Sequence, residues 1–399
     1  MKKIFIMAHS LEIGGAERAL LGLLENIDTT QYQVDLFLLR HQGELMEYLP
    51  KTINLLPENP KYSALGIPIS VVLKRGQFKV ALARYKGKRK ALQRIKQLKV
   101  VGDNNIVNEY SHKYTMNVLP EISQVEYDLA ISFMSPHYFV THKVNAKRKI
   151  AWIHTDYATF QVDVESELKM WNEYDNIVSI SEDVSKSFLK TFPSLENKII
   201  LIENIMPIKY MKTLSDSFSV EKEMPFDKSI KLLTLGRFVY QKKMEEIPMI
   251  CKKIREFNLD VKWYLIGFGN DEELIQKKII ENGMKDYVII LGKKTNPYPY
   301  IKACDLYIQP SRYEGKSIAV REAQAFHKPV VITNYSTASS QLEDGMDGII
   351  VPMDIEKTAE GIAALIKNKE LQKKLCNNMK KRDYVKQKEI EKIYQLMRE

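Results

Sequence analysis

The stretch Ser311–Pro329, which reads SRYEGKSIAVREAQAFHKP, decides the fold that this sequence predicts. A short apolar run at Asp305–Ile308 precedes it and another at Val330–Ile332 follows it, a pattern typical of two buried strands joined through a helix. A strand, a glycine turn at Gly315 and a helix N-terminus direct backbone N–H groups and a partial positive charge at one place. We therefore expect an anion, commonly a phosphate, to bind there.

Two carboxylates lie in this stretch, Glu314 in the turn and Glu322 in the helix. Eight residues of mostly helical rise separate them by roughly 10–12 Å, whereas the acid–base pair of a glycosidase needs roughly 5–9.5 Å. The spacing therefore argues against a hydrolytic pair and suits two anchors of one extended ligand. The alternative is a turn residue and a solvated helix residue without a ligand.

The same residues resemble the signature of the retaining glycosyltransferases of family four, an E-x7-E pattern followed by G-x-P-V-V. The match runs through Ser311, Glu314, Gly315, Glu322, Ala323, Pro329, Val330 and Val331. The sequence departs from the family at Lys316-Ser317, where Phe-Gly is usual, and at His327, where glycine is usual. The resemblance implies the GT-B fold, an α/β architecture in which two Rossmann-like parallel-sheet domains face a central cleft and a C-terminal helix crosses back to the first domain.

A second motif follows the strand expected at Lys231–Leu235. Gly236, Arg237 and Lys242 resemble the family's G-R-x-x-x-x-K-G motif, with Lys243 in place of its last glycine. Arginine offers a planar fork and lysine a mobile point charge, so the two cations can reach one anion together. The resemblance implies that they oppose the charges of a leaving diphosphate, while the first carboxylate of the signature orients the sugar and the second holds the ribose.

The resemblance and the anion site at the helix N-terminus of Gly315–Ser317 together give the expected site residues, and Lys316 is added as a further hypothesis. The catalytic residues are Arg237, Lys242, Glu314 and His154, and the donor-binding residues are Gly14, Gly15, Gly236, Gly267, Gly292, Lys293, Gly315, Lys316, Ser317, Ile318 and Glu322. A lone histidine after a strand, like His154, is more often structural, so its place beside the donor sugar rests on the resemblance. No D-x-D sequence occurs, and we expect no metal and no cofactor besides the nucleotide-sugar co-substrate.

A chain of 399 residues is long enough for two domains. Strand patterns that alternate with helical ones predict parallel sheets, whose ligands bind beyond the carboxyl ends of the strands. We expect an acceptor-binding domain at 1–205, a polar linker at 206–229, a nucleotide-sugar-binding domain at 230–383 and a returning helix at 384–399. The strands expected in the first domain are 3–8, 34–39, 53–56, 127–133, 149–153, 176–180 and 198–202.

The net charge of +10 is concentrated in residues 61–99, and between Asn59 and Gly102 there are twelve Lys or Arg residues and no Asp or Glu. Apolar residues recur at near-helical intervals in Lys74–Lys99, which favours attachment to an anionic membrane surface. A solvated basic helix is the alternative, and we expect no nucleic-acid binding because no such motif accompanies the charge. No apolar run is long enough to span a bilayer and three scattered cysteines indicate reduced thiols, so we expect a cytoplasmic protein on the inner face of the membrane.

The sequence thus predicts a retaining, metal-independent hexosyltransferase that uses a nucleotide-diphosphate sugar, with a UDP-sugar favoured. We expect a saccharide or lipid-linked saccharide acceptor of surface polysaccharide synthesis. Two alternatives remain open, namely a nucleotide-sugar epimerase or hydrolase on the same fold and a non-catalytic sugar-nucleotide-binding protein.

Overall fold

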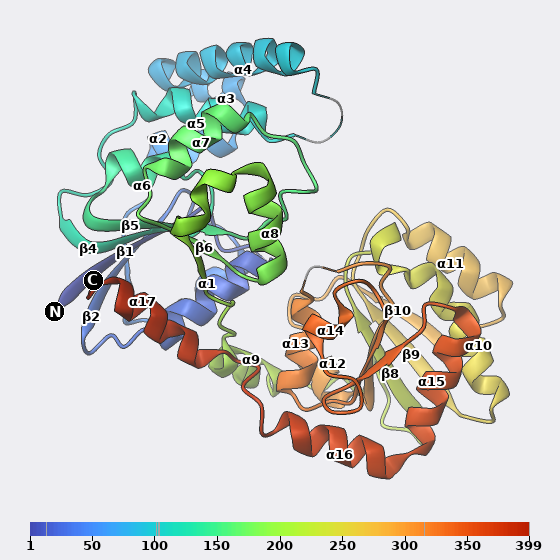
Figure 1. The fold of residues 1–399 in the computed structure, drawn as a ribbon. Helices are drawn as coiled ribbons and strands as arrows, with labels where there is room; N and C mark the ends of the chain where they lie inside the picture. The colour runs from blue at the N-terminus through green and yellow to red at the C-terminus, as the bar shows by residue number, and fades with distance from the viewer. Residues whose placement is uncertain (13, 101, 103, 315, 399) are drawn as a thin grey trace. The chain divides into compact units, whose positions relative to one another are not determined.

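The computed structural model describes residues 1–12, 14–100, 102, 104–314 and 316–398 and divides the chain into two units. Unit 1 comprises Met1–Pro207 together with Lys386–Glu399, and unit 2 comprises Ile208–Val385. Each unit has its own parallel sheet and its own core (Figure 1).

The sheet of unit 1 has seven parallel strands in the order β3-β2-β1-β4-β5-β6-β7. Its strands are β1 (Lys2–Ala8), β2 (Tyr32–Leu38), β3 (Asn54–Leu55), β4 (Glu126–Ser132), β5 (Asn145–Ile153), β6 (Asn176–Ser179) and β7 (Ile199–Leu201). The central strands are continuous apolar runs because helices cover both faces of the sheet. In β1, five successive residues, Ile4–Ala8, are fully buried.

The helices of unit 1 lie between these strands in the sequence, and a last helix comes from the end of the chain. They are α1 (Gly15–Asn26), α2 (Pro60–Ser63), α3 (Ile69–Lys74), α4 (Phe78–Leu98), α5 (Ile106–Met116), α6 (Tyr138–Lys143), α7 (Val164–Asn172), α8 (Glu182–Thr191) and α17 (Ile390–Leu396). In α17, the ring of Tyr394 stacks on Tyr32 at 4.4 Å, and its hydroxyl accepts a hydrogen bond of 2.8 Å from the N–H of Asp28. The returning helix is therefore shorter than the expected 384–399, and Tyr384 and Val385 belong to unit 2.

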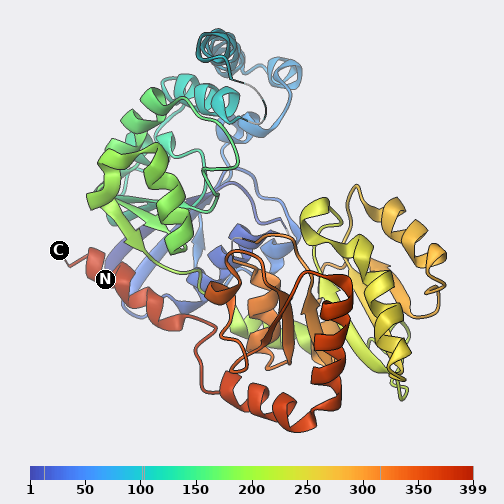
Figure 2. The ribbon, with the colours of Figure 1, turned by 45° about the vertical axis from the view of Figure 1, so that its right-hand side comes forward.

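Most of the basic residues of the range 61–99 lie in helix α4, which lies outside α5 and away from the sheet (Figures 1 and 2). Small residues let the two helices approach closely, since a Cβ on Gly87 would lie 2.6 Å from the carbonyl oxygen of Tyr110. The outer face of α4 instead carries exposed large apolar side chains. These are Phe78, Leu82, Tyr85 and Leu92. Among the residues that the structure describes, no helix is long and apolar enough to cross a membrane.

The sheet of unit 2 has six parallel strands in the order β10-β9-β8-β11-β12-β13. Its strands are β8 (Ile230–Leu235), β9 (Val261–Ile266), β10 (Val288–Gly292), β11 (Leu306–Gln309), β12 (Val330–Thr333) and β13 (Ile349–Val351). Its helices are α9 (Ile208–Ser215), α10 (Ile247–Glu256), α11 (Glu272–Glu281), α12 (Tyr298–Ala303), α13 (Ile318–Ala325), α14 (Ala338–Gln341), α15 (Ile355–Lys367) and α16 (Lys369–Met379).

The segment 206–229, expected as a linker, contains helix α9 instead of an extended polar connection. Tyr210, Met211 and Leu214 are buried, and Tyr210 packs edge-to-face on Tyr298 of α12 at 5.7 Å. The helix is short and polar residues flank it in the sequence, so its apolar periodicity was not recognised.

Both sheets reverse their strand order next to their first strand, between β1 and β4 in unit 1 and between β8 and β11 in unit 2. In open parallel sheets a ligand binds outside the carboxyl ends of the strands at such a point, because the two connections leave in opposite directions and open a crevice. Each unit thus has one place where its fold favours a ligand.

Candidate functional site

The carboxyl ends of β8 and β11 bring Lys242 and Glu314 together. Lys242 Nζ lies 2.5 Å from Glu314 Oε1, and the two side chains are only 15% and 6% exposed. Arg237 follows the same strand β8; its side chain is exposed and forms no hydrogen bond or ion pair with another described residue. One cation is therefore fixed at this edge, and a second is available to a ligand.

A chain of buried polar side chains holds Glu314 from behind. Tyr307 donates to Gln309 at 2.7 Å, Gln309 to Ser311 at 3.0 Å, and Ser311 to Glu314 Oε1 at 2.6 Å. Among the described residues, Ser311 and Lys242 both donate to Oε1 of the carboxylate and none donates to Oε2, so Oε2 can accept from a ligand. Hydrogen bonds of this kind inside a protein rigidify the side chains that they connect.

The N-terminus of α13 differs from the expected open anion site. Gly315 lies outside the described residues, whereas Lys316 and Ile318 are half-buried and Ser317 caps the helix through its Oγ, which accepts from the N–H of Val320 at 3.5 Å. The N–H of Ser317 donates to Gln341 Oε1 at 2.6 Å. A phosphate must displace this amide to use that N–H, because Gln341 already occupies it.

Glu322 is 2% exposed, so the alternative of a solvated helix glutamate is wrong. Its Oε1 accepts a hydrogen bond of 2.9 Å from the hydroxyl of Tyr298, itself fully buried. Burying a carboxylate is unfavourable unless hydrogen bonds compensate for its lost hydration. Glu322 on α13 is therefore better suited to accept hydrogen bonds than to fill the core.

The turns after β8, β9 and β10 pack on one another through their backbones. Gly267 donates to the carbonyl oxygen of Gly292 at 3.0 Å, and a Cβ on Gly267 would lie 1.8 Å from the carbonyl oxygen of Gly236. Glycine at 267 is therefore required by packing alone, whether or not a ligand contacts it. Lys293 is exposed, and its Nζ lies 5.3 Å from the ring centroid of Phe268.

Two departures from the family signature fall on residues with left-handed backbone. Lys243 has φ of 58° and His327 has φ of 55°, and at both positions the family that the sequence resembles usually has glycine. A Cβ atom makes this backbone conformation unfavourable, whereas glycine, which has no Cβ, adopts it without that steric cost. Lys243 partly compensates through an ion pair of 2.9 Å with Glu246 and a hydrogen bond to the carbonyl oxygen of Met353.

The remaining predicted residues, Gly14, Gly15 and His154, belong to unit 1. Gly14 precedes α1 and Gly15 begins it. His154 follows β5, and its Nε2 donates to the carbonyl oxygen of Phe133 at 2.9 Å because a carbonyl can only accept. Its Nδ1 is buried without a hydrogen-bond partner among the described residues, and burial lowers the pKa of His154 to about 4.

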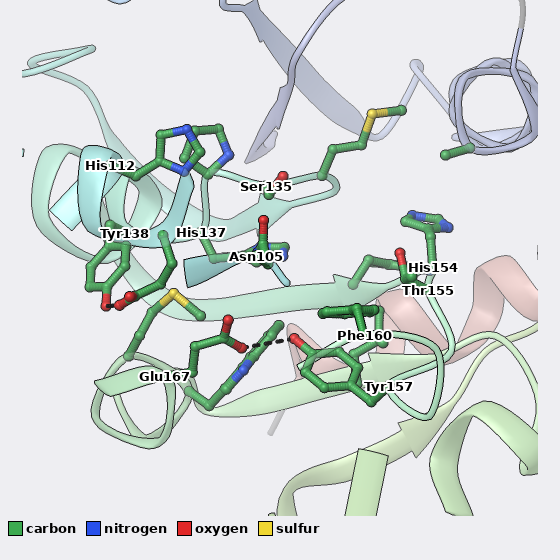
Figure 3. A pocket seen from close by; sticks show the side chains of 18 of the residues that line it. Asn105, His112, Ser135, His137, Tyr138, His154, Thr155, Tyr157, Phe160 and Glu167 are labelled. Carbon is green, nitrogen blue, oxygen red and sulfur yellow. Dashed lines mark hydrogen bonds between the residues drawn. The ribbon is translucent and has the colours of Figure 1, made fainter. Parts of the chain in front are cut away.

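His154 lines a cavity of about 550 Å³ in unit 1, between α5, α7 and the carboxyl ends of β4 and β5 (Figure 3). Sequence reasoning did not find the two buried carboxylates of this cavity, Glu109 and Glu167. One signal was present for Glu167: it shares the helical stripe of Ser166, Met170 and Trp171, so a charged residue stands on an apolar face. Among the described residues, no group of three or more His, Cys, Asp or Glu could hold a metal ion.

Part of the chain is similar to a known protein family. Residues 216–382 match the family model of the glycosyl transferases group 1, so the match covers most of unit 2. An uncharacterized glycosyltransferase of Methanocaldococcus jannaschii is 25% identical over 177 residues, which are 44% of this chain and 43% of that protein. The capsular polysaccharide biosynthesis glycosyltransferase CapM of Staphylococcus aureus is 25% identical over 225 residues, 52% of this chain and 56% of CapM. The chain thus spans about half the length of these curated relatives.

The solved structures extend the similarity to the whole fold. The Anabaena protein HepE, in a crystal structure with UDP and glucose, superposes with a TM-score of 0.66 at 14% identity and covers 99% of both chains. At this identity the likeness concerns the fold alone. Residues 216–382 are therefore similar to the group 1 glycosyltransferases, and the chain has the GT-B fold.

Proposed function

We propose that this protein is a retaining glycosyltransferase that moves a hexose from a UDP-sugar to a saccharide or lipid-linked saccharide acceptor. The observation that carries the proposal is the ion pair of Lys242 with Glu314 at the strand-order reversal of unit 2, with the exposed Arg237 in the same turn after β8. The group 1 family match over the same unit and the UDP-containing structure of HepE support it. The name of CapM supports an acceptor in surface polysaccharide synthesis.

In this mechanism Arg237 and Lys242 act on the leaving group. The bond between the anomeric carbon and the diphosphate oxygen breaks while an acceptor hydroxyl forms the new bond on the same face of the sugar. The hydroxyl proton passes to the departing diphosphate. Cations held in place before the reaction stabilise the developing charge without having to reorganise, which makes this kind of contribution large.

The carboxylates position the donor at its two ends. Glu314 offers Oε2 to the hydroxyls of the sugar while Lys242 and Ser311 hold its Oε1. Glu322 accepts from the ribose hydroxyls and is kept in place by Tyr298. The contact of His154 with the sugar stays a prediction from the sequence, and Lys316 adds a charge contact to the donor. The side-chain cations supply the charge compensation, so we propose that no metal is required and that EDTA leaves the rate unchanged.

A panel of UDP-, GDP- and ADP-sugars tests the donor class. Thermal shift identifies which nucleotide binds, and nucleotide release is then followed with and without a mixture of saccharide acceptors. We expect one UDP-sugar to raise the melting temperature and release to be slow until acceptor is added. Rapid turnover without acceptor would indicate an epimerase or hydrolase, and binding without any product would indicate a non-catalytic protein.

We further propose that α4 attaches the protein to an anionic membrane surface. Phe78, Leu82, Tyr85 and Leu92 lie on the outer face at helical spacing and are 52–67% exposed. Exposed Lys79, Lys86 and Lys90 flank this apolar stripe on one side and exposed Lys88 flanks it on the other, whereas Lys96 lies along it. An apolar stripe flanked by cations suits a helix that lies in the plane of a membrane interface, where each basic residue adds roughly 1 kcal/mol near anionic lipid.

Vesicle sedimentation tests this attachment. We expect retention on vesicles with phosphatidylglycerol, little retention on phosphatidylcholine alone, and about tenfold weaker retention after Leu82→Ser and Leu92→Ser together. Leu274→Ser is the matched control, because Leu274 is an exposed leucine on helix α11 of unit 2. Equal retention by neutral vesicles, or release by oligonucleotides at physiological salt, would refute the proposal.

A further inference from the structure

The segment 333–341 of unit 2, which ends in α14, lies beside the turn between β11 and α13. Thr333 and Thr337 each donate from Oγ1 to a carbonyl oxygen of this turn at 2.6 Å. Gln341 makes the opposite contact, because its Oε1 accepts from the N–H of Ser317 at 2.6 Å. The first two hydrogen bonds hold the backbone of the turn, whereas the third occupies a donor at the N-terminus of α13.

The hydrogen bond to Ser317 fixes which way the Gln341 amide faces. A backbone N–H can only donate, so the amide oxygen lies toward Ser317 and the amide nitrogen lies away from it. Gln341 is 6% exposed, and its Nε2 is buried without a hydrogen-bond partner among the described residues. Burying an unpaired donor is unfavourable. The contact thus gains one hydrogen bond and leaves the N–H groups of the amide without acceptors.

A second polar group of the same segment is also unpaired. Tyr335 is 3% exposed, and its buried hydroxyl has no hydrogen-bond partner in the part of the chain that the structure describes. Burial raises the pKa of this phenol and the charge of Glu314 raises it further, so the hydroxyl lies within electrostatic range of that carboxylate. Buried polar groups are normally paired. Two exceptions in one short segment indicate that it is not packed for this arrangement alone.

The place that the Gln341 oxygen occupies favours a negative charge over a neutral amide. It lies at the N-terminus of a helix of eight residues, where the dipole and the N–H groups attract anions. The Glu314 carboxylate is already paired with Lys242 at 2.5 Å, which limits its repulsion of a phosphate. Hydrogen bonds to a charged oxygen are roughly twice as strong as those to a neutral one. A phosphate oxygen therefore replaces the amide at Ser317 favourably, whereas a neutral hydroxyl oxygen does not.

We propose that Gln341 is a positioning residue that acts through Ser317 as a gate for the donor. Its amide oxygen holds the Ser317 N–H until a charged oxygen of the diphosphate takes that N–H, and the amide then turns away. The gate opens for a ligand that carries phosphate and stays closed to a nucleoside or a free sugar. The inference rests on the proposed transferase function and deepens it, because it names the contact that the donor must replace in order to bind.

Two substitutions of Gln341 have opposite expected effects on the affinity for UDP. Gln341→Met keeps the length of the side chain and removes the amide, so the Ser317 N–H is free and we expect UDP to bind about tenfold more tightly. Gln341→Glu supplies a charged acceptor that holds this N–H more firmly and repels phosphate, so we expect binding to weaken at least tenfold. Isothermal titration calorimetry on the full chain measures both. A residue with only a structural role would weaken binding in both variants, and that result would refute the gate.

Steady-state kinetics supply a second readout. With the donor that the sugar-nucleotide panel identifies, Gln341→Met should lower the KM of the donor about tenfold and leave kcat within twofold of wild type, because the amide has already left Ser317 when the sugar reacts. A fall of kcat with an unchanged KM would contradict the gate.

Thr337→Val is the matched control, because it removes another hydrogen bond from the same segment to the same turn. We expect it to lower the melting temperature of unit 2 without tightening the binding of UDP. Gln341→Met should also lower the melting temperature of the ligand-free protein, since the Ser317 N–H loses its acceptor. Tighter binding of UDP to Thr337→Val as well would show that a looser segment causes the effect, and would overturn the proposal.

Pyrophosphate and uridine separate this inference from the proposed function. Pyrophosphate should gain affinity in Gln341→Met as UDP does, whereas an equal gain by uridine, which has no phosphate, would refute the gate. If UDP binds wild type and Gln341→Met equally, the gate fails while the proposed function stands. If no nucleotide binds, the proposed function fails, and the gate then stands only if pyrophosphate binds more tightly to Gln341→Met than to wild type.

Discussion

The two units share one topology and differ in the chemistry that it carries. Each sheet reverses its strand order next to its first strand, and each has polar side chains at the carboxyl ends that meet there. In unit 2 these are Lys242, paired with the carboxylate of Glu314, and the exposed Arg237. In unit 1 they are neutral histidines among aromatic rings, and helices α5 and α7 add the buried carboxyls of Glu109 and Glu167. One backbone plan thus carries cations in one unit and uncharged imidazoles in the other.

The largest expected effect is the loss of the cations of unit 2. We predict that Arg237→Ala and Lys242→Met each lower kcat by about 10²–10³, since each removes one preorganised charge opposite the leaving diphosphate. Lys252→Ala, which removes an exposed lysine on α10, is the control in steady-state assays. A kcat within twofold of wild type in both variants would remove the basis of the comparison.

A smaller effect tests whether the units are stable separately. Tyr394→Ala loses the stack on Tyr32 and the hydrogen bond to Asp28, so we predict that unit 1 loses about 3 kcal/mol of unfolding free energy. Tyr394→Phe keeps the stack and should lose only about 1 kcal/mol. Calorimetry should show a lower melting temperature for unit 1 and an unchanged melting temperature for unit 2. An equal shift of both transitions would contradict the division.

The third prediction uses the opposite titrations of the cavity. The pKa values of His112, His137 and His154 are about 3, 3 and 4, against 6.5 in an unfolded chain, so the unfolded state binds more protons and stability falls as pH drops from 6.5 towards 4. Glu167 acts in the opposite sense, because its pKa of about 7 against 4.5 makes the folded state bind its proton first. It adds stability as pH drops from 7 towards 4.5.

The measurement is the melting temperature of unit 1 between pH 7 and 4.5. We expect the three histidines to dominate and the melting temperature to fall by about 5 °C or more. Glu167→Gln should make the fall steeper, because it removes the opposing titration. A melting temperature of unit 1 that is independent of pH in both proteins would show that the cavity is not as buried as described.

The smallest effect concerns the left-handed residues of unit 2. We predict that His327→Gly stabilises unit 2 by about 1 kcal/mol, since its φ of 55° is unfavourable for a residue with a Cβ. Asn258→Gly, at φ of 57°, is the matched comparison and should gain less, because asparagine tolerates this conformation better. Chemical denaturation measures both. A loss of stability on His327→Gly would mean that the imidazole makes contributions beyond its backbone.

Much of the fold could be predicted because parallel strands buried on both faces are apolar throughout. The expected strands fall within four residues of the observed ones, the largest difference being the start of β5 at Asn145 in place of Lys149. Helix α9 was missed because only one short face of it is apolar within a polar segment. The end of the chain was expected to be helical from 384, but only Ile390–Leu396 forms an α-helix.

Site residues that belong to a sequence motif were predicted. Those that only tertiary packing brings together or buries were missed. The pairing of Lys242 with Glu314 follows from two motifs that a sheet brings together, and both motifs are visible in the sequence. The hydrogen bond from Ser317 to Gln341 could not be foreseen, because it joins residues 24 apart through tertiary packing. Glu109 looks like any helix glutamate in the sequence, and only the fold surrounds it with Tyr138 and Ser166.

The return of the chain to unit 1 has a consequence for its synthesis. Tyr394, in the C-terminal segment 386–399, stacks on Tyr32 and accepts a hydrogen bond from Asp28, both near the start of the chain. Arg148 of β5 donates to the carbonyl oxygen of Leu396 in the same segment. A ribosome delivers these residues only after all of unit 2 has been translated. The first unit to emerge is therefore the last to be completed, and until then its early strands must persist without the helix that closes them.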